Sequence, residues 1–225
     1  MTELRSQFHE ELEQLEHDLV LMSDHAAKMI NDSMAALVAS DAEAAQAVID
    51  FDDVVDDLFL GVHERWLATM ALQTPVAIDL RLMSVILHVN SHLERIADLA
   101  VTVAKITELA HGLPHDSTVI SHLQEMADLV ASMVGTVMGA FVNRDLETAL
   151  GLPEMDRPVN RMNRKMVRKV VRFAEDTELL EWGVRMMVVS RTLERAGDNA
   201  VDIAEQLAFL LTGEFREFTD ASHHD

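Results

Sequence analysis

Apolar side chains recur along the chain at steps of three and four residues, the spacing of one face of a helix packed in a bundle. The first stripe consists of Phe8, Leu12, Leu15, Leu19, Met22, Ala26 and Met29. This pattern predicts a helix that continues to about Ser40. Asp41 then has the character of an N-cap, because its short side chain can accept a backbone hydrogen bond at the start of a second helix.

Two more helices are predicted before the first clear break. The second carries an apolar stripe of Val48, Val55, Leu58, Val62 and Trp66. Pro75 ends this helix or opens the third, which runs to about Ala110. The third stripe comprises Leu82, Ile86, Val89, Leu93, Ile96 and Ala100. Residues 111–116, with the sequence HGLPHD, then form the clearest break in the chain.

The second half of the chain repeats the first. Apolar positions recur 104 residues later, as when Leu15 is matched by Val119, and near the third helix the offset becomes 100. A repeat of this length indicates two copies of one helical unit, each with its own core. We therefore predict an all-α fold of two tandem three-helix bundles, with six long helices. The expected boundaries are 1–112 and 113–213, and residues 214–225 lack a stripe and are expected to form a flexible tail.

Composition narrows the class of protein. Helix-forming alanine, leucine, methionine and glutamate are plentiful, whereas the 225 residues include only four prolines and eight glycines. Cysteine is absent, which excludes disulfides and thiolate metal sites. A net charge of −21 argues against nucleic-acid binding. We see no signal-like segment, no apolar run of membrane-spanning length and no nucleophilic triad, so we predict a protein of the cytoplasm that is not an enzyme.

Acidic pairs spaced four residues apart occupy matched places in the two repeats. They are Asp52 with Asp56, Glu94 with Asp98, Asp156 with Asn160 (one acid and one amide), and Glu194 with Asp198. Side chains at this spacing share a helix face, about 6 Å apart at Cβ, so two carboxylates repel each other unless a cation lies between them. A single pair such as Asp53 with Asp57 is more often a solvated face. The recurrence of such pairs at matched positions of both repeats favours a metal-binding role.

The helical angles of these pairs predict surface sites between neighbouring helices. Asp202 and Glu205 lie close to the same stripe as Glu194 and Asp198. Oxygen ligands favour hard cations such as magnesium, manganese or iron, and zinc is less natural without histidine.

Several segments resemble motifs of the PhoU family. Residues 93–98 (LERIAD) and 193–198 (LERAGD) look like its paired L-E-R-[IA]-[GA]-D signatures, and residues 75–81 (PVAIDLR) resemble its P-x-A-x-D-L-R segment. Asp52-x-x-Val-Asp56 and Asp156-x-x-Val-Asn160 resemble its second-helix motif. The similarity covers about residues 8–213, and both motifs occur in order in both repeats.

The resemblance implies a negative regulator of phosphate uptake and of the phosphate-starvation genes. Its implied partners are the ATPase of a phosphate ABC transporter and a phosphate-sensing histidine kinase, and its implied state is a homodimer. Such a protein would meet the inner face of the plasma membrane only through the transporter. Some members of the family bind magnesium, manganese, iron or zinc, and the ligands implied here are Asp52, Asp56, Glu94, Asp98, Asp156, Glu194 and Asp198.

The second repeat departs from the family pattern. Asn160 replaces a frequent acid, and Asp202 or Glu205 could compensate for the lost charge. Pro153 and Pro158 interrupt the fifth helix, because proline lacks an N–H and blocks the preceding turn. We therefore expect that helix to kink or restart near Asp156, and we expect the first metal site to be the more regular.

A dense basic run follows in the fifth helix, opposite the apolar Val159, Met162 and Met166. It contains Arg157, Arg161, Arg164, Lys165, Arg168, Lys169 and Arg172. It is either a solvated face paired with acids of a neighbouring helix, or a docking surface for an acidic partner or anionic lipid head groups. The candidate partner-binding residues are Arg157, Arg161, Arg164 and Arg168.

Two other functions remain open from the residues alone. A ferritin-like carboxylate oxidase or metal store needs two inward-facing Glu-x-x-His motifs, and only Glu108 with His111 fits, at a helix end. A structural adaptor whose acid pairs bind nothing is the third possibility. His88 and His92, four residues apart, are expected to be partly buried polar side chains rather than ligands.

Overall fold

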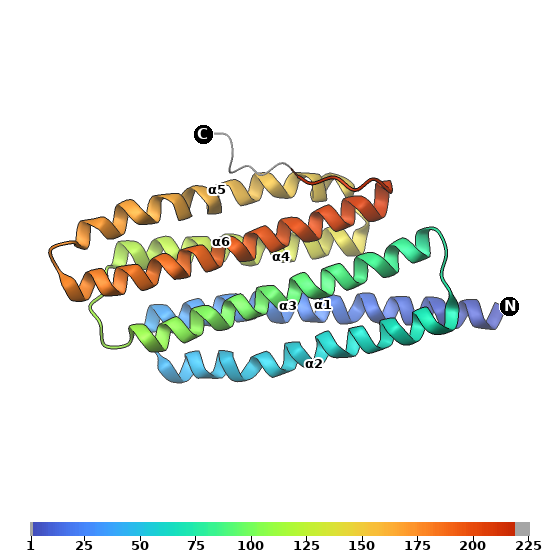
Figure 1. The fold of residues 1–225 in the computed structure, drawn as a ribbon, viewed down its shortest axis with the longest axis horizontal. Coiled ribbons are helices and arrows are strands. Elements are labelled where there is room, and N and C mark those ends of the chain that lie inside the picture. The colour runs from blue at the N-terminus through green and yellow to red at the C-terminus, as the bar shows by residue number, and fades with distance from the viewer. Residues whose placement is uncertain (1, 219–225) are drawn as a thin grey trace.

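The computed structural model describes residues 2–218, with side chains from residue 7 onward, and over this range it contains helices and no strands. The described residues form six long helices, as predicted. Figure 1 shows that they are arranged as two bundles. Their bounds are α1 Thr2–Ala39, α2 Ala42–Gln73, α3 Ile78–Ala110, α4 Ser117–Asn143, α5 Leu146–Val170 and α6 Thr177–Thr212. A short 3₁₀ helix, η1 Val171–Phe173, follows α5 directly.

Aspartate caps start four of the helices. Asp41, Asp116, Asp145 and Asp176 each accept a backbone hydrogen bond from the first turn of α2, α4, α5 and α6. The predicted cap at Asp41 is confirmed, since its Oδ1 accepts from the N–H groups of Glu43 and Ala44 at 3.0 Å. These caps satisfy N–H groups that have no partner within the helix, and so they fix where each helix begins.

The helices pack as two antiparallel bundles that share one core. Helices α1, α2 and α3 contact one another, as do α4, α5 and α6, and the two sets meet where α1 packs on α4 and α3 packs on α6. Most side chains of the predicted apolar stripes are buried, and Leu58, Trp66 and Leu82 are partly buried against them. The buried residues form one continuous hydrophobic cluster, so the expectation that each bundle has its own core is wrong. Helices α2 and α5 contact only helices of their own bundle and lie at opposite edges of the molecule (Figure 1). Each therefore exposes a long outer face.

A kink or a restart was expected in the fifth helix near Asp156, and the restart is wrong. Helix α5 is a single helix from residue 146 to residue 170, with Pro153 and Pro158 inside it. Each proline removes one backbone hydrogen bond. Burial of Leu152, Val159 and Met166 against the neighbouring helices compensates for this loss.

Helix α4 is the one described helix that is long and apolar enough to cross a membrane by length and composition. Half of its most apolar window is buried inside the fold, where it packs against α1, α5 and α6. Its apolar character is therefore accounted for by its place in the core.

The start of the predicted tail contacts the second bundle. The N–H of Phe218 donates to Oε1 of Glu205 at 2.6 Å, and the ring of Phe215 packs edge-on against Phe209. Residues 219–225, the rest of the predicted tail, lie outside the described residues.

Candidate functional site

The first-repeat acids come together from two neighbouring helices. Helix α2 supplies Asp52 and Asp56, and α3 supplies Glu94 and Asp98. Burial raises the pKa of Asp52 to about 6, and repulsion from Asp56 and Asp98 adds to the effect. Burial, then Asp98 and then Asp56, also raise the pKa of Glu94. The four predicted ligands thus feel one another's charge, and we call them the first cluster.

The first cluster lies on the surface, as the sequence predicted. Asp52 and Glu94 are half-buried, whereas Asp56 and Asp98 are exposed. The cluster borders an open groove of about 590 Å³ between the two bundles, lined by Asp52, Arg95, Asp98, Leu99, Val101, Thr102, Lys105, Arg195 and Asn199. Lys105 partly offsets the rise in the pKa of Asp52. Solvent and ions can therefore reach the carboxylates from this groove.

The second cluster differs from the first in its burial and in its hydrogen bonds. It is formed by Asp156, Asn160, Glu194 and Asp198. Asp156 and Glu194 are only 5% and 8% exposed, so the prediction of a surface site is wrong for these two side chains. Nδ2 of Asn160 donates to Oδ2 of Asp156, and the guanidinium of Arg191 pairs with Glu194. Two acids of this cluster are thus bonded to groups of their own helices.

Three exchanges between the repeats account for this contrast. Asn160 stands where the first repeat has Asp56, and Arg191 stands where it has Ser91. Gly197 replaces Ala97, and a Cβ atom added at Gly197 would lie 2.8 Å from Oδ1 of Asp156. The missing side chain lets α6 approach the carboxylate closely, so Asp156 can be buried where Asp52 is not.

Asp202, the candidate substitute ligand, faces the first bundle. Its Oδ2 lies 3.5 Å from Nδ1 of His92 on α3. Burial raises the pKa of Asp202, while His92 and Arg95 act in the opposite direction. Asp202 therefore belongs to the contact between α3 and α6, where its strongest charged neighbours come from the other repeat.

Asn199 is a residue of this junction that sequence reasoning missed. Its Oδ1 lies 2.9 Å from Nδ1 of His92, and its Nδ2 donates to the backbone oxygen of Arg195 at 2.8 Å. The half-buried state expected of His92 is confirmed, whereas His88 is exposed. The only hint in the sequence was the position of Asn199 directly after the second signature.

The remaining candidates lie apart from the carboxylate clusters. Arg157, Arg161, Arg164 and Arg168 are exposed along α5, opposite the buried Val159, Met162 and Met166, as predicted. His111 caps the end of α3, and its Nδ1 lies 3.2 Å from the backbone oxygen of Ser40, which follows α1. Glu108 and His111 are both exposed, so they lack the inward orientation that a ferritin-like site requires.

No three carboxylate or imidazole groups within the described part of the chain converge tightly enough to form a ready-made metal site. The donor set of the first cluster nevertheless suits a hard cation, since it offers four carboxylates from two helices and no soft ligand. Two of its members, Asp56 and Asp98, are exposed to solvent.

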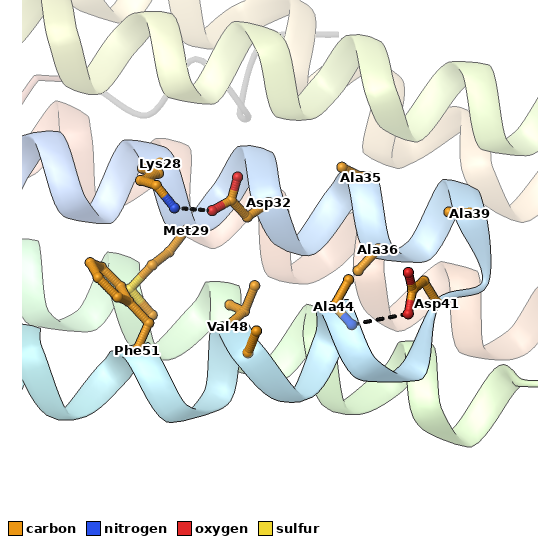
Figure 2. A pocket seen from close by; sticks show the side chains of 11 residues that line it. Lys28, Met29, Asp32, Ala35, Ala36, Ala39, Asp41, Ala44, Val48 and Phe51 are labelled. Carbon is orange, nitrogen blue, oxygen red and sulfur yellow. Dashed lines mark hydrogen bonds and ion pairs between the residues drawn. The ribbon is translucent and has the colours of Figure 1, made fainter.

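A second hollow, of about 550 Å³, lies where α1 and α2 join (Figure 2). Its lining is mostly alanine, with the Lys28–Asp32 ion pair and Phe51 at one end and the cap Asp41 at the other. None of the described residues that line it is a predicted ligand, so this hollow adds no group to the two carboxylate clusters.

The fold and the clusters define a class of two-repeat helical proteins that carry a matched acidic motif on α2, α3, α5 and α6. A model of the PhoU domain matches residues 19–107 and 123–207, one copy for each bundle. The chain belongs to the PhoU family.

Relatives with known names support this assignment. The chain is 29% identical over 218 residues, covering 96% of its length and 99% of the relative, to a Clostridium acetobutylicum protein named phosphate-specific transport system accessory protein PhoU homolog. It is 31% identical to a Pseudomonas aeruginosa protein of the same name, covering 98% of this chain and 89% of the relative.

Solved structures of PhoU proteins have the same fold as this chain. The crystal structure of PhoU from Pseudomonas aeruginosa matches with a TM-score of 0.85 at 30% identity, over 92% of this chain and all of that one. The regulatory protein PhoU from Streptococcus pneumoniae has the same fold, with a TM-score of 0.85 at 23% identity, over 94% of this chain and all of that one.

Proposed function

We propose that this protein is a cytoplasmic negative regulator of phosphate uptake and of the phosphate-starvation response. It acts by binding the ATPase of a phosphate ABC transporter and a phosphate-sensing histidine kinase, and it turns over no substrate. Support comes from the family assignment and from relatives named as accessory proteins of the phosphate-specific transport system. The helices that carry the two signatures, α3 and α6, contact each other where the two bundles meet, so both signatures lie at the junction of the bundles.

The first cluster is proposed to hold a hard cation, with magnesium, manganese and iron favoured over zinc. The observation that carries this proposal is the pKa of Asp52, which is raised to about 6 by burial and, in addition, by repulsion from Asp56 and Asp98. Carboxylates that repel each other gain free energy when a cation enters between them. Asp52, Asp56, Glu94 and Asp98 would supply the oxygens.

Paired variants on α2 test the metal proposal. D52N/D56N removes two proposed ligands, whereas D53N/D57N removes two acids of the same helix that are exposed and lie outside the cluster. Manganese titration by calorimetry should show binding to the wild type and to D53N/D57N, and binding weakened about tenfold or more in D52N/D56N. Equal affinity in the two double variants, or no binding to the wild type, would refute the metal site.

Affinity purification tests the regulatory proposal. The tagged full-length protein should retain a phosphate-transporter ATPase and a phosphate-sensing kinase from cells grown in high phosphate. If the protein retains neither the ATPase nor the kinase, both in high phosphate and without phosphate, the regulatory proposal is contradicted. Light scattering on the purified protein tests the proposed homodimer separately, and a monomer at micromolar concentration would remove that element alone.

A further inference from the structure

Helix α5 and the short helix η1 that follows it carry a concentrated strip of positive charge in a strongly acidic protein. We call it the basic ridge; it comprises Arg157, Arg161, Arg164, Lys165, Arg168, Lys169 and Arg172. All of these side chains are exposed except the half-buried Lys169. Residues 157–174 contain no acidic residue, although the whole chain carries a net charge of −21. The ridge therefore presents a local potential of the opposite sign to the rest of the surface.

Neighbouring acids do not neutralise the ridge. Arg157 pairs with Glu154 at 2.5 Å. Among the residues that the structure describes, no ion pair within 4.0 Å joins the other six cations to a carboxylate. The first of the two alternatives from the sequence, a face paired with acids of a neighbouring helix, is therefore wrong for these six side chains.

The first repeat provides an internal comparison. Helix α2 holds the same place in its bundle as α5, at the opposite edge of the molecule (Figure 1). At the positions of Arg157, Arg161 and Arg168 it has the acids Asp53, Asp57 and Glu64. All three acids are exposed. An edge helix of this fold therefore tolerates either sign of charge, and the cations of α5 are not a requirement of packing.

Exposed valines border the ridge. Val167 and Val171 are 48% and 63% exposed, and on α6 Val184 and Val188 are similarly open. The two helices are antiparallel and in register here, because Gly183 abuts Val170 and Oγ of Ser190 donates to Oδ1 of Asn163 at 2.9 Å. The valines thus occupy the same level of the pair as the C-terminal half of the ridge.

We propose that the basic ridge docks the protein on an anionic lipid bilayer. From Arg157 to Arg172 the ridge extends about 22 Å along α5 and η1, at the edge of the molecule. A strip of cations along one outer helix suits a plane of phosphate head groups, which needs no cleft for binding. Guanidinium groups bind phosphate oxygens in pairs. The bordering valines suit the boundary between head groups and acyl chains.

This orientation has a structural consequence. With α5 on the membrane, α2 at the opposite edge faces water, so the acidic surface of the first repeat stays away from the anionic lipid. The protein would then reach a membrane directly, rather than only through the transporter. The inference does not depend on the proposed regulatory partners, because the bilayer itself is the ligand.

Vesicle sedimentation of the full-length protein tests the proposal. The protein should sediment with vesicles of phosphatidylcholine and phosphatidylglycerol in equal amounts, and not with phosphatidylcholine alone. The variant R161Q/R164Q/R168Q should bind about tenfold more weakly or worse, since each cation contributes to attraction by anionic lipid. K28Q/K105Q/R216Q, which removes the same charge from exposed residues outside the ridge and its bordering valines, should bind as the wild type does. Matching thermal melts would show that both variants are folded.

Added salt should release the wild type from the anionic vesicles, because screening weakens attraction between exposed charges. Equal loss of binding in the two triple variants would overturn the proposal, since net charge alone would then govern binding. Failure of the wild type to bind anionic vesicles, together with ridge-dependent binding to poly-glutamate, would assign the ridge to an acidic protein and would also overturn it.

Discussion

Gly197 of α6 lies directly against the carboxylate of Asp156 on α5, so that a Cβ atom on Gly197 would stand 2.8 Å from Oδ1. Asp156 is buried, and Asn160 bonds its other oxygen. The carboxylate therefore has little room to retreat. Alanine at position 197 would gain about 1 kcal/mol of helix propensity, but overpacking typically costs about 1–3 kcal/mol.

We predict that Gly197→Ala lowers the free energy of unfolding by about 1 kcal/mol, as measured by urea denaturation. The control is the same change in an Asp156→Ala background. With the carboxylate removed, alanine at 197 should become neutral or stabilising. If Gly197→Ala has the same effect in both backgrounds, the close approach to Asp156 is not the reason for glycine at this position.

Arg81 links the start of α3 to the end of α6, 129 residues away. Its Nη1 donates to the backbone oxygen of Leu210 at 3.1 Å, and its guanidinium lies 5.7 Å from the ring centre of Phe209. Carbonyl groups of the last turn have no partner within the helix, so a cation there both caps the helix and complements its dipole.

We predict that Arg81→Ala destabilises the protein by about 1–2 kcal/mol in urea denaturation. Arg81→Lys should recover only part of this loss, because an ammonium group cannot reproduce the planar stacking on Phe209. A variant with unchanged stability would show that the contact between the two bundles does not depend on this side chain.

The repeated pattern of apolar positions was sufficient to predict six helices, because burial of a three–four stripe is a local requirement that each helix meets separately. Asp41 was predictable as a cap for the same reason. The restart expected near Pro158 was wrong, because that prediction considered the local cost of a proline and not the packing of α5 against α4 and α6. That packing is a property of the assembled fold.

In the candidate sites, too, the local features were predictable from the sequence and the contacts between helices were not. The spacing of Asp52 and Asp56 showed that they share a helix face, but not that Asp98 of another helix joins them. The burial of Asp156 depends on Gly197, and the two positions are brought together only by the pairing of α5 with α6. The exchange of Ala97 for Gly197 was visible in the printed sequence, and it is the one signal that could have indicated a closer approach.

The raised pKa of Asp52 predicts how stability depends on pH. The folded-state pKa is about 6 against 3.8 for an unperturbed aspartate, so the folded protein binds more protons than the unfolded chain between these values. This group therefore opposes folding fully above pH 6, and its effect fades as the pH falls toward 3.8. Asp52→Asn should raise the melting temperature at neutral pH in the presence of a chelator.

Thermal melts of the wild type and of Asp52→Asn from pH 7.5 down to pH 4 check this prediction. The difference in melting temperature between them should shrink as the pH falls through 6. Asp53→Asn serves as the control, because Asp53 is exposed and is the last of the groups that act on Asp52. A difference that stays constant over this range would mean that Asp52 titrates normally.

The two carboxylate clusters should differ in their affinity for metal. In the second cluster Asn160 and Arg191 already bond Asp156 and Glu194, so an entering cation must displace these groups. The first cluster has Asp56 and Ser91 at the equivalent positions. An acid replaced by an amide removes one charged ligand, and a nearby arginine competes with the metal for the carboxylates that remain.

Exchanging these positions between the repeats tests the argument. The variant D56N/S91R should lose manganese binding at the first cluster, about tenfold or more by calorimetry. The reverse exchange, N160D/R191S, should create or strengthen a second binding event, because it restores an acid and frees Glu194 from its arginine. Neither pair of changes alters the buried apolar core, so thermal melts should show that both variants fold. A wild-type protein that binds metal only through Glu194 and Asp198 would reverse the ranking, and it would place the functional cation at the junction of α5 and α6 rather than at that of α2 and α3.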